Sequence, residues 1–462
     1  MKTLITGIFS LVIIWSACRN DVLSGVGTPE GTTYIEPSDQ RSGDAGKGYD
    51  YITTGNYVSS GIPLGIYKLA FGSSVKEDLN RTGDNSGISY TFTVSTASNG
   101  VKIVSNNCFS CHAEHLNGQL VVGLGNNTGD NTNDVTNQFN TIDSAVQLYG
   151  TNSPEWAAYY PFSRGFKSIA PYIQTNVRGV NPADKIFAAL AGFRKSDDLT
   201  WLNTSQYTLP REVIPTDVPA WWLMKKKNAL YFDGLGKGDF ARLSMATALV
   251  TMKDSTEARQ IDAHFPDVMA WIRTIQAPKN PNAIDATLAA QGKTVFINTC
   301  AKCHGTYDAP QTYPNLLVDL NYIGTDSALA KVYFSNPQYH TWYNTSWFNQ
   351  KPAAAQLLPN RGYVAPPLDG IWATAPYLHN GSVPTLDDLL NSTQRPKYWS
   401  RTFDNSDYDK VKVGWNYMVQ TSKKDNQTYD TTLKGYGNGG HTFGDVLSAN
   451  DRKAVIEYLK TL

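Results

Sequence analysis

Two short stretches of the chain repeat one pattern of cysteine and histidine, Cys-x-x-Cys-His, at residues 108–112 and 300–304. This pattern is the attachment site of c-type haem, in which two thiols add to the vinyl groups of the porphyrin. The order matters because both sulfur atoms must reach one edge of the ring before the next residue folds under the iron. The thiols predicted to carry two covalent haem c groups are Cys108, Cys111, Cys300 and Cys303.

The histidine that ends each motif, His112 or His304, is predicted to be the proximal ligand of its iron. Two other interpretations exist: a zinc site built from both cysteine pairs, and disulfides between them. Both leave the two histidines unexplained, and a zinc knot is typical of a much smaller domain. We therefore expect two haem sites.

The sixth ligand of each iron decides between electron transfer and catalysis, because only an open position admits peroxide or dioxygen. His441 lies after two glycines and just before the last predicted helix, where the backbone can approach a porphyrin closely. We predict His441 as the sixth ligand of the second haem, with Met418 or a surface role for His441 as alternatives. For the first haem, the methionines and His264 in that half are more often core residues. The lack of a clear ligand favours an open, catalytic site.

The bulk composition sets limits and does not name a function. The chain has 462 residues, with 40 Lys and Arg against 40 Asp and Glu. A net charge of zero gives no reason to expect a nucleic-acid partner. The 12% aromatic content suits haem pockets or apolar ligand surfaces, and the length predicts two or three domains.

The first 17 residues predict export. They carry a single Lys, an apolar run too short to span a bilayer, and a small-residue cleavage site. Cys18 follows Ser-Ala, which resembles a bacterial lipoprotein signal with a lipidated cysteine; an ordinary secretory signal is the alternative. We expect a periplasmic or outer-membrane-attached protein whose only membrane contact is this anchor. Residues 19–50, rich in Gly, Ser, Asp and Thr, are predicted to be a flexible tether.

A linker rich in Pro and Asn at residues 277–282 divides the rest of the chain. Residues 51–276 are predicted to form a modified cytochrome c domain, and residues 283–462 a second one. Apolar residues at helical spacing precede the second motif, Ser448 begins a capping box before a final helix, and Gly292 would let two helices approach closely. The predicted fold is mainly α, with two cytochrome c-type domains that each bind one covalent haem, and with loop-rich and short-strand insertions.

The loop after the first motif is crowded with Asn, Thr, Gly and Asp. Asp130, Asn131 and Asp134 offer oxygen ligands for calcium, but their spacing matches no known calcium motif. A plain surface loop is the alternative.

Residues 375–386, Ala-Pro-Tyr-Leu-His-Asn-Gly-Ser-Val-Pro-Thr-Leu, resemble a segment of the bacterial di-haem cytochrome c peroxidase superfamily. Other features resemble its rubber-oxygenase-type (RoxA-like) branch. They are Trp-Trp-x-x-Lys-Lys-Lys-Asn-Ala at 221–229, the glycines of 234–239, Arg395-Pro396, and Gly-His-x-Phe-Gly at 440–444. The resemblance extends over roughly residues 51–462.

This resemblance implies one active haem and one electron-storing haem. It assigns His112 to the active haem, where peroxide or dioxygen would bind, and His304 with His441 to a bis-histidine haem. His379 is implied as a hydrogen-bonding residue beside the second haem. A redox partner protein or a small oxidant is the implied partner.

Trp221 and Trp222, with His379, are the predicted catalytic residues. The two tryptophans would line the distal pocket or carry electrons between the haems, and core packing is the alternative. Lysines 225–227 would meet haem propionates or an acidic partner, or would simply be solvated. The sequence thus predicts an exported di-haem oxidoreductase. The alternatives are a lipid-anchored electron carrier with two six-coordinate haems, and a haem-bearing binding module.

Overall fold

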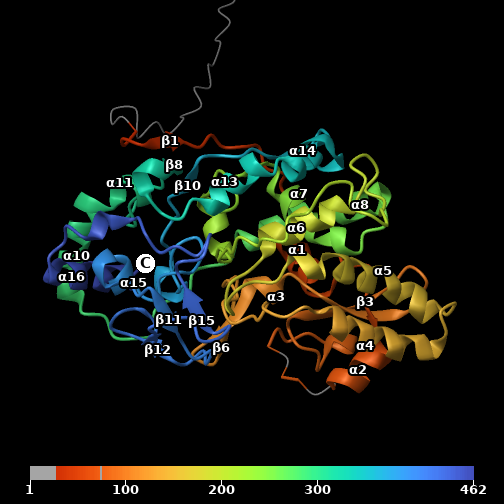
Figure 1. Ribbon diagram of the computed structural model, residues 1–462. Helices are drawn as coiled ribbons and strands as arrows, with labels where there is room; N and C mark the ends of the chain where they lie inside the picture. The colour runs from red at the N-terminus through yellow and green to blue at the C-terminus, as the bar shows by residue number, and fades with distance from the viewer. Residues whose placement is uncertain (1–27, 73–74, 77) are drawn as a thin grey trace, which may run out of the picture.

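The computed structural model describes residues 28–72, 75–76 and 78–462, and the predicted export signal with Cys18 lies outside them. The chain is 38% helical and 13% strand, with the strands in several small sheets. The prediction of a mainly α fold is therefore wrong. The molecule instead combines short helices with small antiparallel sheets of short strands (Figure 1).

The helices are short, and most are joined by long irregular segments. The α-helices are α1 (Ala45–Thr54), α2 (Leu64–Phe71), α3 (Phe109–His112), α4 (Thr136–Val146), α5 (Pro154–Ile169), α6 (Ala183–Gly192), α7 (Phe240–Ser244), α8 (Ser255–Asp262), α9 (Phe265–Ile272), α10 (Ala286–Thr299), α11 (Ala301–His304), α12 (Leu320–Ile323), α13 (Ala328–Ser335), α14 (Gln338–Thr345), α15 (Leu386–Leu389) and α16 (Ala449–Leu459). The 3-10 helices are η1 (Gly83–Asn85), η2 (Gln147–Tyr149), η3 (Ala170–Tyr172), η4 (Trp221–Lys226), η5 (Met245–Val250), η6 (Trp347–Asn349), η7 (Ile371–Ala373), η8 (Ser392–Gln394) and η9 (Thr442–Gly444).

The strands pair in antiparallel fashion, in sheets of two or three. The strands are β1 (Thr32–Tyr34), β2 (Ile62–Pro63), β3 (Phe92–Thr96), β4 (Lys102–Asn106), β5 (Ala113–Leu116), β6 (Gln119–Val122), β7 (Gly236–Gly238), β8 (Leu316–Asp319), β9 (Ala355–Leu357), β10 (Gly362–Val364), β11 (Tyr398–Ser400), β12 (Tyr408–Asp409), β13 (Gly414–Trp415), β14 (Met418–Val419) and β15 (Thr428–Asp430). The sheet orders are β1-β8-β10, β2-β4-β3, β5-β6, β7-β9, β12-β13 and β14-β11-β15.

Two helix pairs depend on glycine for their close contact. In the first half, α1 packs on α9, and a Cβ at Gly48 would lie 2.0 Å from the backbone oxygen of Asp267. In the second half, α10 packs on α16, and a Cβ at Gly292 would lie 1.8 Å from the backbone oxygen of Ala454. Only glycine allows such an approach. The predictions of a close contact at Gly292 and of a Ser448 cap on the final helix are confirmed, because Ser448 accepts a hydrogen bond from the Asp451 backbone.

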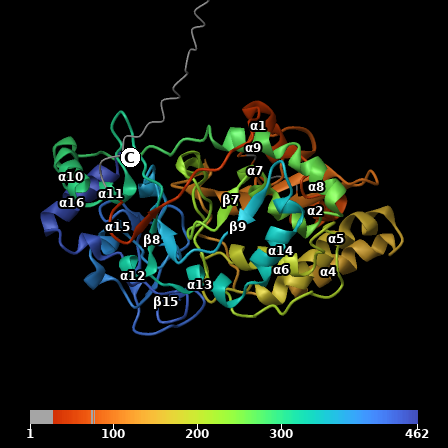
Figure 2. The same cartoon turned by 90° about the horizontal axis from the view of Figure 1, so that it is seen from above.

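The segment before α1 runs along both halves of the molecule (Figures 1 and 2). Its strand β1 pairs with β8 of the second half. Farther along, Arg41 forms ion pairs with Asp239 at 2.9 Å and with Asp262 at 2.6 Å, both in the first half. The tether prediction is therefore wrong for residues 28–50, because backbone pairing and buried ion pairs hold this segment on the body.

The linker at 277–282 does not separate two independent halves. Strand β9 and helix α14 follow the linker, yet they pack against β7, α6 and α7 of the first half. In the other direction, Leu116, Leu124 and Trp222 belong to the hydrophobic core around α16. The two halves therefore share their cores.

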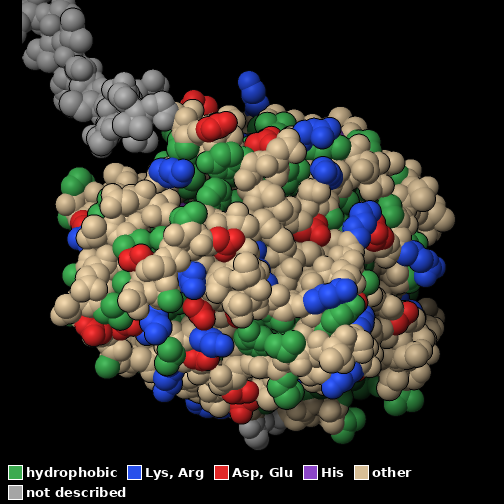
Figure 3. Space-filling view, turned by 60° about the vertical axis from the view of Figure 1, so that its left-hand side comes forward, with side chains coloured by type: hydrophobic (Ala, Val, Ile, Leu, Met, Phe, Trp, Pro, Cys, Tyr) green, Lys and Arg blue, Asp and Glu red, His purple; other side chains and the backbone are tan. Residues whose placement is uncertain are grey.

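The surface carries mixed charge. On the face shown in Figure 3, Lys and Arg side chains alternate with Asp and Glu, as the zero net charge suggests. Among the described helices, none is both long and apolar enough to cross a bilayer.

Candidate haem-binding sites

The second Cys-x-x-Cys-His motif lies on a single helical turn directly after α10. The backbone N–H groups of Cys303 and His304 donate to the Cys300 carbonyl, so this turn gathers both thiols and the imidazole. Burial raises the pKa of Cys300 to about 11 and that of Cys108 in the first motif to about 12, which leaves neutral thiols. The four described cysteines form no disulfide. In the described part of the chain, three or more His, Cys, Asp or Glu side chains nowhere converge as for a metal ion.

One hydrogen bond orients the imidazole of His304. It is made by Nδ1, so Nε2 is the nitrogen that could bind a metal. Its Nδ1 lies 2.8 Å from the carbonyl oxygen of Pro366, which requires a proton on Nδ1 and leaves the Nε2 lone pair available. Burial lowers the pKa of His304, and the Pro366 carbonyl partly offsets this. A neutral imidazole oriented by a backbone carbonyl is the arrangement that metal-ligating histidines require.

His441 faces His304. Its backbone N–H donates to the Ile323 carbonyl at 2.7 Å, and its φ of 46° lies in the left-handed region. The preceding Gly440 meets the backbone of Gly324, where a Cβ would lie 2.2 Å from the carbonyl carbon. Arg395 donates to the carbonyl oxygens of the same loop, including that of His441 at 3.2 Å. This close backbone approach places the imidazole in the interior.

The space between His304 and His441 fits an iron-centred ring. Their ring centroids lie 6.2 Å apart. Two imidazoles that ligate one metal ion from opposite sides, at metal–nitrogen distances of about 2 Å, have centroids roughly 6 Å apart. Burial lowers the pKa of His441 to about 3, with His304 and Arg395 as further causes, and its Nδ1 has no hydrogen-bond partner. Met418, the alternative ligand, is 61% exposed on β14 and does not lie in this interior.

The first motif has different surroundings. His112 ends α3, and burial lowers its pKa to about 4. The carbonyl of Pro219 lies near the imidazole and partly offsets this lowering of the pKa. The Nδ1 of His112 nevertheless makes no hydrogen bond within the described structure. The Trp221 ring stacks on the imidazole, with centroids 4.6 Å apart and planes 18° apart. The partly buried neutral imidazole with a carbonyl on one side fits a proximal ligand here also.

No second histidine is seen opposite His112. His264 stacks on Tyr51 at 4.3 Å, and His115 lies 3.4 Å from the carboxylate of Asp78. The methionines of this half that the sequence singled out lie in or against the core, as the packing alternative predicted: Met224, Met245, Met252 and Met269. The described residues therefore offer the first site a proximal imidazole and no evident sixth ligand.

His379 is buried and stacks on Tyr363, with ring centroids 4.1 Å apart. Burial lowers its pKa to about 3, and its Nε2 has no hydrogen-bond partner in the described structure. The next residue, Asn380, donates to the carbonyl oxygens of Gly435 and Gly437, just before His441. The segment of His379 thus supports the His441 loop, while a hydrogen-bonding role for His379 itself remains a prediction.

Trp221 and Trp222 contact different parts of the molecule. Trp221 stacks on His112, whereas Trp222 donates from Nε1 to the carbonyl oxygen of Asp369 at 2.8 Å. Asp369 follows Pro366, the partner of His304, by three residues. Both tryptophans are also buried in the core. Core packing, the alternative interpretation, therefore applies to both of them.

The lysines after the tryptophans are engaged within the protein. Lys226 forms an ion pair with Asp369 at 2.6 Å, and Lys225 donates to the Ile275 carbonyl. Lys227 donates weakly to the Tyr231 carbonyl at 3.4 Å, and burial lowers its pKa to about 8. Lys226 and Lys227 are therefore held inside the protein, whereas Lys225 is exposed to solvent.

The loop proposed to bind calcium uses its oxygens locally. Asp130 accepts from the backbone and hydroxyl of Thr132, and Asp134 accepts from the backbone of Thr136. Asn131 donates to the Val180 carbonyl. The loop therefore gives the calcium prediction no support.

The sequence assigned no role to three residues whose contacts shape the two sites. Pro219 and Pro366 turn their carbonyl oxygens toward the proximal imidazoles, and Arg395 holds the His441 loop together. Arg395 was one of the residues that resemble the RoxA-like branch, but only its contacts with the His441 loop reveal its role.

The His304 site has the features of a cytochrome c-type haem site: two thiols, an imidazole oriented by a carbonyl, and a facing imidazole. Residues 362–400, which include Pro366, His379 and Arg395, match the family described as RoxA-like, cytochrome c-like. One such segment matches, so the prediction of two cytochrome c domains is wrong. This match indicates haem c and a haem-related redox role.

Two proteins of Sinorhizobium fredii (strain NBRC 101917 / NGR234) are similar to this chain. Uncharacterized protein y4iM is 27% identical over 311 residues, which cover 59% of this chain and 71% of that protein. Uncharacterized protein y4iJ is 43% identical over 111 residues, which cover 22% of this chain and 18% of that protein. Their names give no activity, so the redox role rests on the cytochrome c-like segment.

Proposed function

We propose that this chain is an exported di-haem c-type oxidoreductase, in which peroxide or dioxygen reacts at the first site and the second site stores or relays electrons. The observation that carries the proposal is the difference between the sites. His304 has a second imidazole at 6.2 Å, whereas His112 has Trp221 beside it and no second imidazole opposite it among the described residues. An iron with two strong protein ligands transfers electrons, and one with an open position binds small oxidants.

In this proposal the four thiols of the motifs hold two haem c groups, and His112, His304 and His441 are iron ligands. Each bound haem would supply a redox-active iron that can gain or lose one electron. The contribution of this chain is to orient the ligands. Pro366 fixes the tautomer of His304 through Nδ1, and Arg395 with Ile323 fixes the backbone at His441. Such outer contacts tune a metal site as well as position it.

Trp221 and Trp222 are the proposed route between the sites. They are neighbours in sequence, one in contact with His112 and the other with the backbone that leads to Pro366. Their packing in the core keeps the two indoles fixed. His379 is proposed to act from the second site, through the loop that its segment supports.

The location and partners are proposed from the sequence. The N-terminal signal predicts export, with lipidation at Cys18 and attachment to the outer membrane, or a soluble periplasmic form. The proposed partners are a small oxidant, peroxide or dioxygen, and a redox protein that exchanges electrons with the second site.

Optical and EPR spectra of the purified, haem-loaded protein test this function. We expect one high-spin and one low-spin ferric haem, and carbon monoxide binding by about half of the ferrous haem. Two low-spin haems that ignore carbon monoxide would instead identify an electron carrier. If carbon monoxide binds, turnover with hydrogen peroxide compared with dioxygen and an unsaturated apolar polymer then identifies the oxidant.

A further inference from the structure

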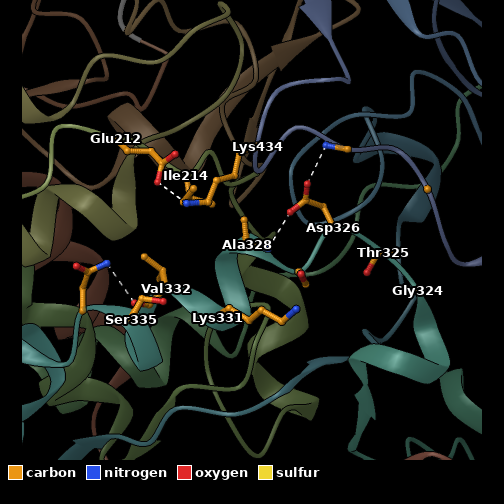
Figure 4. A pocket seen from close by; sticks show the side chains of 14 residues that line it. Glu212, Ile214, Gly324, Thr325, Asp326, Ala328, Lys331, Val332, Ser335 and Lys434 are labelled. Atoms are coloured by element: carbon orange, nitrogen blue, oxygen red, sulfur yellow. Dashed lines mark hydrogen bonds and ion pairs between the residues drawn. The ribbon is translucent and has the colours of Figure 1, made fainter.

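A cavity of about 550 Å³ opens between α13 and the loop of residues 434–440 (Figure 4). Its apolar lining comes from Ile214, Ala328 and Val332, while Gly437 and Gly439 of the loop form the facing wall. The volume lies in the range of sites for small organic ligands. Neither the proposed haem ligands nor the thiols line this cavity.

Of the charged side chains that line this cavity, some form hydrogen bonds or ion pairs and one does not. Glu212 and Lys434 form an ion pair at 2.6 Å. Asp326 accepts hydrogen bonds from the backbone N–H groups of Ala328, Gly435 and Gly437, which engage both carboxylate oxygens. Lys331, by contrast, makes no side-chain hydrogen bond or ion pair with any described residue, and Figure 4 shows its ammonium directed along the cavity toward Thr325. The unpaired charge of the lining is therefore a cation.

Thr325 lines the same cavity, and its hydroxyl has no partner. The residue is 7% exposed, and its Oγ1 makes no hydrogen bond within the described structure. A buried hydroxyl without a partner is unfavourable, so an acceptor that reaches Thr325 would gain this hydrogen bond. Lys331 is thus a free donor on the cavity, and the Thr325 hydroxyl, itself closed to solvent, becomes a second donor when its side chain turns toward a ligand.

We propose that this cavity binds a small organic carboxylate with an apolar body. Its carboxylate pairs with Lys331 and accepts from Thr325, and its apolar part packs on Ile214 and Val332. A cation is disfavoured because both carboxylates of the lining are already engaged. A phosphate is a poorer fit because one free ammonium beside an apolar wall offers too few donors for it.

Binding would also act on the second haem site, because the cavity wall continues into His441. Asn380 holds the wall at Gly435 and Gly437, and Arg395 holds it at Asn438 and Gly440. A ligand that fills the cavity would steady this loop and shift the midpoint potential of the second haem. This consequence rests on the proposed function, whereas the binding itself does not.

Isothermal titration with benzoate tests the binding, with neutral benzamide as the matched probe. We expect saturable binding of benzoate, weakened at least about tenfold by Lys331→Gln and by a smaller factor by Thr325→Val. Lys453→Gln is the control, because Lys453 is also exposed and unpaired on a helix but does not line the cavity. It should bind benzoate as the unmodified protein does. Both test positions allow folding, since Lys331 is exposed and valine has the shape of threonine.

Benzoate binding that is unchanged in Lys331→Gln, or benzamide binding of equal strength, would overturn the proposal, as would the absence of saturable binding. A benzoate-dependent shift in the potential of the second haem, absent from Lys331→Gln, would support the coupling to His441. Failure of the proposed function would appear as two low-spin haems without carbon monoxide binding. That result leaves the titration unaffected, so the two failures are distinguishable.

Discussion

The two Cys-x-x-Cys-His motifs share one sequence pattern, but the residues that surround them in the structure differ. At each motif a partly buried neutral imidazole faces a proline carbonyl, but His304 forms that hydrogen bond and His112 does not. On the far side, His304 meets a second imidazole at 6.2 Å. Among the described residues no second imidazole faces His112, and Trp221 stacks on the face of its ring.

This difference shows what the motif does and does not specify. Two thiols and a histidine specify attachment and one ligand. The other side of the ring is set by chain segments far away in sequence, such as the loop at His441. A symmetrical pair of motifs can therefore serve two different roles.

The largest expected effect is the loss of one haem at a time. Replacing Cys300 and Cys303 by serine should remove the low-spin haem, because serine cannot form the thioether bond. The same change at Cys108 and Cys111 should remove the haem that binds carbon monoxide. Mass spectrometry and a pyridine haemochrome assay would show half of the haem left in each variant. If either double variant keeps both haems, its motif is not an attachment site.

A narrower test removes the feature that separates the sites. His441→Ala should convert the second haem from low spin to high spin, because its sixth ligand is lost, and should raise carbon monoxide binding to both haems. EPR and optical spectra would measure this change. His264→Ala is the matched control, since His264 stacks on Tyr51 away from His441. A low-spin signal that survives in His441→Ala contradicts the assignment.

The second site was the more predictable from sequence, for physical reasons. Gly292, the Ser448 cap and the helix before Cys300 follow from local spacing, and the structure confirms all three. The facing position of His441 was also predicted, because glycines before it allow a close approach. Its use as an iron ligand stays a prediction.

The rest depends on contacts between residues distant in sequence. The polar composition of residues 28–50 predicted a tether, but Arg41 meets Asp239 and Asp262 about 200 positions later. The pairing of β9 with β7 likewise crosses the expected domain boundary. The strands that overturned the mainly α prediction are two to five residues long, too short for an alternating pattern to identify.

A smaller effect is expected on the route between the sites. Trp222→Phe removes the hydrogen bond to Asp369 and should slow electron exchange between the two haems severalfold, while both spectra stay unchanged. Flash photolysis of the carbon monoxide complex of the half-reduced protein would measure the rate. Trp342→Phe is the control, because Trp342 is also buried and loses a hydrogen bond, to the Arg194 carbonyl, away from this route. Equal slowing in both variants would mean a general packing effect.

The smallest expected effect concerns buried acids in the first half. Asp233 is 2% exposed, and burial raises its pKa from 3.8 to about 7. The pKa of Asp184 is also raised to about 7, mainly by burial and further by the charge of Asp233. Between about pH 4 and 7 the folded protein therefore holds protons that the unfolded chain has released, so the free energy of unfolding falls as pH rises.

Asp233→Asn should remove part of this dependence, because asparagine stays neutral and can still accept the hydrogen bond from Leu235 through Oδ1. We expect the variant to gain roughly 1–3 kcal/mol over the unmodified protein at pH 8, and less at pH 5. Urea unfolding followed by circular dichroism at both pH values measures this, with the exposed Asp39→Asn as control. If Asp233→Asn is instead destabilised more at pH 8 than at pH 5, Asp233 is ionised and stabilised by Lys227. The buried charge would then be a source of stability in the first half.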